Sequence, residues 1–78
     1  MPTRELALQV EESLRRIGTP LGVKTAVLIG GANMNPQIRA LRDGPHIVIA
    51  TPGRLIDHME HGTIRLSGVT ILVLDEAD

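Results

Sequence analysis

Acidic side chains follow an apolar run at the end of the sequence, where Leu74 leads into Asp75, Glu76, Ala77 and Asp78. This pattern is typical of a buried parallel strand that brings an aspartate to the carboxyl edge of a sheet. Carboxylates placed there can bind Mg²⁺ through one or two side chains and several waters. Glu76 could then polarise a water for attack on a phosphoryl group. A solvated acidic tail is the alternative interpretation, and it stays open on these residues alone.

A second candidate site lies at a predicted helix start, in the segment Thr51-Pro52-Gly53-Arg54. It combines a hydroxyl, the backbone N–H groups of a helix start and a guanidinium, which together suit a phosphate group. An ordinary capped helix with a solvated arginine is the alternative. Thr3 and Arg4 repeat the combination at the first predicted helix, and the same two interpretations apply there.

Two further patterns carry less chemistry. His58 and His61 are three residues apart, but the helix ends there and no third metal ligand is evident. We therefore interpret both as part of a solvated helix face.

Residues 18–25 superficially resemble a phosphate-binding loop. The true loop has four residues between its glycines and a lysine directly after the second one, whereas here three residues separate Gly18 from Gly22. We reject this match and find no other such loop in the sequence.

Three segments have the spacing of apolar residues and the end signals of helices. They are predicted to end at Gly18, Gly44 and Gly62. The predicted N-caps are Thr3, either Asn33 or Asn35, and Thr51, with Pro36 and Pro52 at first helical positions. The predicted buried stripes are Leu6, Val10, Leu14 and Ile17 in the first helix, Ile38 and Leu41 in the second, and Leu55, Ile56 and Met59 in the third.

Residues 24–29, 46–50 and 70–74 are short apolar segments that we predict to be strands. Helices and strands therefore alternate, which predicts an α/β fold with a parallel sheet and helices on its faces. Each strand is continuously apolar, so each is expected to be covered on both faces. Ligands bind at the carboxyl ends of such strands. The candidate loops are therefore Gly30-Gly31, residues 51–54 and residues 75–78, together with the start of the first helix.

Composition limits how such a chain is stabilised. Its 78 residues make one domain or part of one, with no Cys, Phe, Tyr or Trp. A core without aromatic side chains is small, so stabilisation by a partner chain is expected. The net charge of −1 excludes a strongly basic nucleic-acid module. No apolar stretch approaches the roughly 20 residues of a membrane span, and the polar start lacks a signal peptide. These features favour a cytoplasmic protein without a membrane partner.

Taken together, the motifs resemble those of the DEAD-box RNA helicases over the whole chain. The segment Pro2-Thr3-Arg4-Glu5-Leu6-Ala7 resembles motif Ia, and Gly30-Gly31 resembles the GG motif, with Gln37 at the usual distance beyond it. Thr51-Pro52-Gly53-Arg54-Leu55 resembles motif Ib, and Asp75-Glu76-Ala77-Asp78 is the motif that names the family. Four motifs in this order make a chance match very improbable.

The resemblance implies roles for these residues. Motifs Ia, GG and Ib of the family hold an RNA backbone, which implies that Pro2, Thr3, Arg4, Gly30, Gly31, Thr51, Pro52, Gly53 and Arg54 contact phosphates and 2′-hydroxyls. Such contacts are independent of base sequence. The acidic motif implies that Asp75 holds the Mg²⁺ of ATP, mainly through water, and that Glu76 orients the hydrolytic water. Ala77 and Asp78 would couple the nucleotide site to neighbouring motifs and to the second domain.

Several parts of the family pattern are absent from these 78 residues. They are the Q motif, the Walker A loop, the Ser-Ala-Thr motif and the whole second RecA-like domain. The chain is therefore expected to be the middle of a first RecA-like domain, with residues 1–78 as a single partial domain of about three strands and three helices. The resemblance implies that an absent strand lies between the second and third strands, so a gap is expected there.

The function implied is that of an ATP-dependent RNA helicase, with ATP and Mg²⁺ as cofactors of the parent protein. Without the Walker A loop, the 78 residues are expected to bind ATP weakly and not to hydrolyse it. Two alternatives stay open for the chain itself. One is a weak RNA-backbone-binding module. The other is a structural fragment that repairs its sheet by strand exchange or self-association as a homo-oligomer.

Overall fold

A computed structural model of the chain describes residues 3–65 and 67–74 and confirms the α/β prediction. The helices are α1 (Thr3–Gly18), α2 (Met34–Arg42) and α3 (Pro52–Glu60), with a 3₁₀ turn η1 (Thr19–Leu21) after the first. The strands β1 (Thr25–Leu28), β2 (Ile47–Ala50) and β3 (Thr70–Val73) form one parallel sheet in the order β1-β2-β3. In this part of the chain, no helix has the length and apolarity to cross a membrane.

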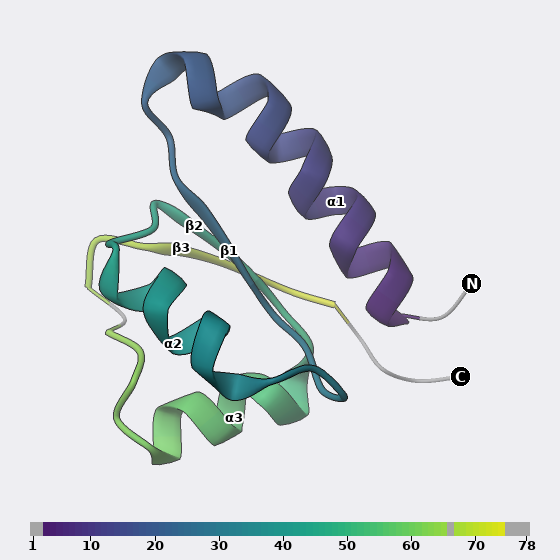
Figure 1. The fold of residues 1–78 in the computed structure, drawn as a ribbon, viewed down its shortest axis with the longest axis vertical. Coiled ribbons are helices and arrows are strands. Elements are labelled where there is room, and N and C mark those ends of the chain that lie inside the picture. Colours follow the sequence, from purple (N-terminus) through teal and green to yellow (C-terminus); the bar gives the residue numbers. More distant parts are fainter. Residues whose placement is uncertain (1–2, 66, 75–78) are drawn as a thin grey trace.

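Helix α1 covers one face of the sheet, where it contacts β1 and β2 (Figure 1). Ala7 is fully buried there against Ile29 and Ile49, with Val10 and Leu14 packed beside them. The predicted stripe was therefore wrong at its two ends, because Leu6 is 40% exposed and Ile17 is 69% exposed. The helix presents its small Ala7 to the sheet, and this rotation turns the side chain of Leu6 outward.

Helices α2 and α3 lie on the opposite face (Figure 1). Ala26, Leu28, Val48 and Ala50 form the buried centre of this layer, and Ala40, Leu41 and Leu55 pack against it. The predicted stripe of α3 was wrong for Ile56 and Met59, which are 52% and 48% exposed. Leu55 and the polar His58 face the interior instead. Polar contacts, described below, orient α3 in this way.

The helix ends agree in part with the predicted signals. Asn33 caps α2, since its Oδ1 accepts a hydrogen bond from the backbone N of Asn35 at 2.9 Å. Because α2 begins at Met34, Pro36 is the third helical residue and not the first. Gly44 and Gly62 follow the second and third helices with φ values of +78° and +66°. Glycine adopts this left-handed conformation at little cost, so both residues reverse the chain toward the next strand.

Strands β2 and β3 pair directly, with Ile47 opposite Thr70 and Ala50 opposite Val73. The expected gap between them is therefore absent, because parallel pairing satisfies the backbone groups that a gap would leave open. The expectation that both faces of every strand are covered is also wrong for β3. Leu72 and Val73 are 42% and 47% exposed, because the main contacts of α1 with the sheet are to β1 and β2.

Candidate nucleic-acid interface

The first part of the candidate site joins the start of α1 to the turn after β1. Gly31 lies in this turn with a φ of +77°, a conformation that residues with a side chain rarely adopt. A Cβ atom on Gly31 would lie 3.1 Å from Nη1 of Arg4, so the guanidinium packs directly on the glycine. The structure thus brings Arg4 to Gly31 in the turn that follows β1, whereas a Cβ atom on Gly30 would have no neighbour within 4 Å.

Gln37 connects α2 to the same turn. Its side chain is 6% exposed, and its Nε2 donates a hydrogen bond to the backbone oxygen of Ile29 at 2.9 Å. Leaving a buried carbonyl without a partner costs about 1–3 kcal/mol. This bond therefore stabilises the backbone where the chain leaves β1.

Arg54 points from the first turn of α3 toward the turn after β1. Its Nη1 donates to the backbone oxygen of Ala32 at 3.1 Å and lies 3.3 Å from Oε1 of Gln37. Its Nε is 3.6 Å from Oδ2 of Asp57, and its side chain is 12% exposed. The interpretation as a solvated arginine is therefore wrong. The guanidinium belongs to the interior of the site, where it adds positive charge near the carboxyl edge of the sheet.

Thr51 occupies the N-cap position of α3 but does not cap it through its hydroxyl. The predicted side-chain cap was therefore wrong, although Pro52 does begin the helix. The backbone of Thr51 is well held, because its N donates to Leu28 O and its O accepts from Leu55 N, both at 3.0 Å. Thr51 Oγ1 is buried and has no hydrogen-bond partner among the residues that the structure describes. Gly53 follows in the first turn of the same helix.

His58 is fully buried, so the interpretation of both histidines as a solvated face was wrong for this one. Its Nε2 lies 2.8 Å from Oε1 of Gln37, and its Nδ1 lies 2.7 Å from Oγ1 of Thr63. His61 is exposed, as expected, and its Nδ1 lies 2.7 Å from the backbone oxygen of Asp57. The two histidines therefore have different environments despite their three-residue separation.

The environment of His58 favours its neutral form. Burial lowers the pKa of the imidazole below its usual 6.5, and the positive charge of Arg54 lowers this pKa further. The carboxylate of Asp57 opposes both effects by raising the pKa, whereas His61 adds to the lowering. His58 is therefore a neutral hydrogen-bonding group at pH 7.

Sequence reasoning missed this buried polar cluster of Gln37, Arg54, His58 and Thr63. A signal for part of it was present, because Arg54 and His58 are four residues apart and therefore share a helix face with Leu55. The partner on α2 carried no comparable signal, since a lone glutamine in a helix is usually exposed. Gln37 stood out in the sequence only through the family resemblance.

Comparison with known proteins agrees with the motif pattern. The sequence model of the DEAD/DEAH box helicases matches residues 1–78. The chain belongs to the DEAD/DEAH box helicase family. It is 52% identical over 77 residues to the DEAD-box ATP-dependent RNA helicase CshA of Geobacillus kaustophilus and 53% identical over 77 residues to DEAD-box ATP-dependent RNA helicase 5 of Arabidopsis thaliana. These matches cover 99% of the chain but only 16% and 14% of the two relatives.

In this member of the helicase family, two predicted segments fall outside the described residues. They are Pro2 and the acidic motif with Asp75, Glu76 and Asp78. The approach to the acidic motif is described, because β3 runs parallel to β2 and Leu74 N donates to Ala50 O at 2.9 Å. The chain thus reaches residue 74 beside the strand that leads into Thr51.

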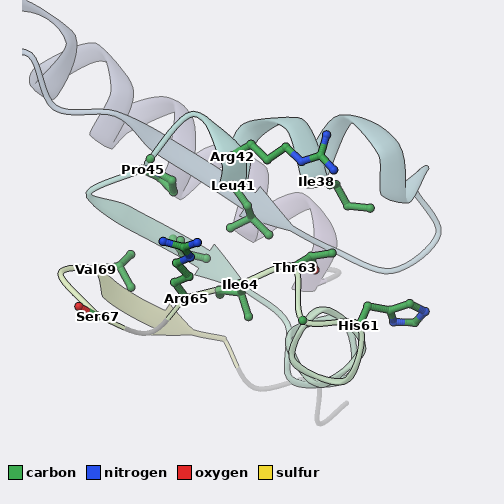
Figure 2. Close-up of a pocket in the computed structure, with 13 residues that line it drawn as sticks. Ile38, Leu41, Arg42, Pro45, His61, Thr63, Ile64, Arg65, Ser67 and Val69 are labelled. Atoms are coloured by element: carbon green, nitrogen blue, oxygen red, sulfur yellow. The ribbon is translucent and has the colours of Figure 1, made fainter.

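A separate cavity of about 640 Å³ lies away from the predicted helicase motifs (Figure 2). It is lined by residues near the C-terminal ends of α2 and α3 and by residues that precede β2 and β3. Leu41, Ile64 and Val69 contribute apolar surface, and Arg42 and Arg65 contribute charge. Figure 2 shows His61 pointing away from this space. None of the predicted site residues within the described ranges lines the cavity, so it is not the predicted site.

Proposed function

We propose that this chain is a segment of the first RecA-like domain of an ATP-dependent RNA helicase and that the carboxyl edge of its sheet contacts an RNA backbone. The observation that carries the proposal is the meeting of three family motifs at one edge. Arg4 packs on Gly31, and Arg54 donates to Ala32 in the same turn. The relatives' names as RNA helicases support the choice of RNA as the ligand.

The proposed contacts are electrostatic and independent of sequence. Arg4 and the N-terminal turns of α1 and α3 supply positive charge and backbone donors, which suit phosphate oxygens. Arg54 is held inside the edge, so its contribution is mainly the field of its charge and the placement of the turn. The residues assigned to RNA by the resemblance stay the same: Pro2, Thr3, Arg4, Gly30, Gly31, Thr51, Pro52, Gly53 and Arg54.

For the parent protein, we propose that Mg²⁺ and ATP bind next to the acidic motif. Asp75 would hold the metal mainly through water, Glu76 would orient the attacking water, and Asp78 would join the nucleotide site to the rest of the core. The 78 residues contain no Walker A spacing, so we expect the chain by itself to show no RNA-stimulated ATPase. Measurable ATP hydrolysis by the pure chain would contradict this. We also propose a cytoplasmic location for the parent.

Fluorescence anisotropy with a labelled single-stranded RNA tests the backbone contact. We expect weak binding that decreases with salt and depends little on base composition, because the contacts are to phosphates. Arg4→Ala should weaken binding about fivefold or more, since a hydrogen bond to a charged group is worth at least about 1 kcal/mol.

The matched control is Arg16→Ala, which removes the same charge from the other end of α1. Arg16 is exposed and paired with Glu12 at 3.0 Å. Arg16→Ala should change RNA affinity by less than about twofold, because residue 16 lies in the last turn of α1, far from the proposed contact at its first turn. No binding by the unaltered chain at low salt would refute the proposal. Equal effects of the two substitutions would show that the predicted edge is not the RNA contact.

A second candidate is favoured by the exposure of β3. Its outer edge has no paired strand among the described residues, and Leu72 and Val73 lie exposed along it. Open apolar edges readily pair with another chain. We therefore also propose that isolated chains associate through β3. Light scattering across a hundredfold concentration range should show a mass that increases with concentration, and a constant monomer mass would exclude this.

A further inference from the structure

The buried polar cluster has a bonding pattern that leaves little freedom to its members. Gln37 Nε2 donates to Ile29 O, while Gln37 Oε1 lies within hydrogen-bond distance of Arg54 Nη1 and His58 Nε2. A backbone oxygen can only accept, and a guanidinium can only donate. The amide of Gln37 is therefore oriented with its oxygen toward α3 and its nitrogen toward the end of β1.

This orientation determines the tautomer of His58. Because Oε1 of Gln37 is an acceptor, Nε2 of His58 must carry the hydrogen. In the neutral ring, Nδ1 is then an acceptor, so the single hydroxyl hydrogen of Thr63 points to it over 2.7 Å and not to the backbone oxygen of His58, which also lies 3.0 Å from Thr63 Oγ1. The backbone oxygen of His58 is still satisfied, since Thr63 N donates to it at 3.0 Å. Both ring nitrogens and the amide thus have partners in one consistent arrangement.

The cluster connects regions that are distant in sequence. Gln37 and His58 are separated by 21 residues, and Arg54 and Ala32 by 22. Through these bonds the turn after β1 is joined to both α2 and α3. The two residues at the centre are 6% and 0% exposed, so they do not themselves reach a ligand.

We propose that Gln37 and His58 are positioning residues, which hold the turn of residues 29–32 and the guanidinium of Arg54 in the geometry that meets an RNA backbone. This inference rests on the proposed function, because the edge they organise is the proposed RNA contact. Neither residue touches RNA. Each acts through Arg54 and the backbone of the turn. Substitution of Gln37 or His58 therefore makes the edge less ordered without removing a group that contacts RNA.

The test uses ¹⁵N NMR on the 78-residue chain without RNA. In the unaltered chain, the ring signals of His58 should report hydrogen on Nε2, and backbone order parameters of residues 30–32 should be about 0.85, as in rigid backbone. In Gln37→Met, a side chain of similar length without donors or acceptors, these order parameters should fall below about 0.6. Hydrogen on Nδ1 in the unaltered chain would overturn the assignment.

Controls separate positioning from simple loss of stability. Leu55→Ala removes a packing group from the same helix and should leave the order parameters of the turn unchanged while the chain stays folded. His58→Gln keeps an N–H donor for Gln37 and should preserve the turn, whereas His58→Leu should loosen it. If Gln37→Met does not fold, Gln37→Glu keeps an acceptor for Arg54 and His58 but turns a carboxylate oxygen toward the carbonyl of Ile29, so it should also loosen the turn. A turn unaffected by any of these changes, or loosened equally by Leu55→Ala, would refute the positioning role.

RNA titration of the same variants completes the test. Gln37→Met and His58→Leu should lower affinity at least fivefold, with His58→Gln close to the unaltered chain. If the unaltered chain binds no RNA, the proposed function fails, and the NMR measurements still decide whether the cluster orders the turn. If RNA binds normally to a variant with a loosened turn, the positioning role fails and the proposed function stands.

Discussion

Strands β2 and β3 are similar in sequence but very different in environment. Both are four-residue apolar strands, and they pair with each other in parallel register. Val48, Ile49 and Ala50 of β2 are fully buried, whereas Leu72 and Val73 of β3 are nearly half exposed. The difference arises because β2 has a strand on each side and helices on both faces. An apolar run therefore predicts a strand, but its burial depends on which other elements reach it.

The largest expected difference in the free energy of unfolding is between substitutions at two residues that are paired across these strands. Ile49 and Leu72 are register partners. Ile49→Ala should lower the free energy of unfolding by about 2–5 kcal/mol, because it leaves a cavity in a closed core. Leu72→Ala should lower it by about 1 kcal/mol or less, since the side chain is only partly removed from water. Urea unfolding measures both. Equal losses would show that β3 is covered in solution.

The two histidines extend the comparison to α3. His58→Leu should cost about 1–3 kcal/mol, because it removes a hydrogen-bond donor from the buried oxygen of Gln37 and leaves the hydroxyl of Thr63 with only the backbone oxygen of residue 58, 3.0 Å away, as acceptor. His61→Leu should change stability within about ±0.5 kcal/mol, as for most surface substitutions. Urea unfolding of the two variants under identical conditions provides the measurement. A similar cost for both would contradict the burial of His58.

The lowered pKa of His58 predicts a smaller, pH-dependent effect. The unfolded chain binds a proton at His58 more readily than the folded chain does. The neutral ring therefore makes its full contribution to the free energy of unfolding when the pH is above the unfolded pKa of about 6.5. That contribution is lost progressively as the pH falls through 6.5 toward the lower folded pKa. Burial is the largest cause of the lowered folded pKa; Arg54 and His61 lower it further and Asp57 raises it, while Gln37 and Thr63 are uncharged. Urea midpoints between pH 7.5 and 5.5 should fall less in His58→Gln than in the unaltered chain, and parallel profiles would contradict the assignment.

The smallest expected effect on stability is at the exposed strand. Val73→Lys should change the free energy of unfolding within about ±0.5 kcal/mol, because the side chain is already largely in water. It should nevertheless reduce the concentration-dependent mass expected for β3-mediated association, since lysine on an edge strand discourages pairing. Ala50→Lys, at the paired position of β2, is the contrasting variant and should prevent folding. Association unaffected by Val73→Lys would locate the contact elsewhere.

Much of the fold could be predicted from local patterns. The three strands and three helices lie within about two residues of their predicted ends, because caps, turns and periodicity involve residues only a few positions apart. The joining of Arg4, Gly31 and Arg54 at one edge also follows from parallel strands and short connections. The rotation of the helices was not predictable in this way. Leu6, Ile56 and Met59 have the spacing of core residues but lie exposed.

Residues close together in the sequence determine the order and type of the helices and strands. They also determine the edge of the sheet at which the polar loops emerge. His58 and Arg54 lie inside the protein because they hydrogen-bond to a residue more than 15 positions away in the sequence. That residue becomes their neighbour only when α2 and α3 pack on the same face of the sheet. The direct pairing of β2 with β3, and the exposure of β3, were decided likewise by which backbone edges and helix faces met. Local patterns are short-range, whereas burial and hydrogen bonding across elements depend on the whole assembled chain.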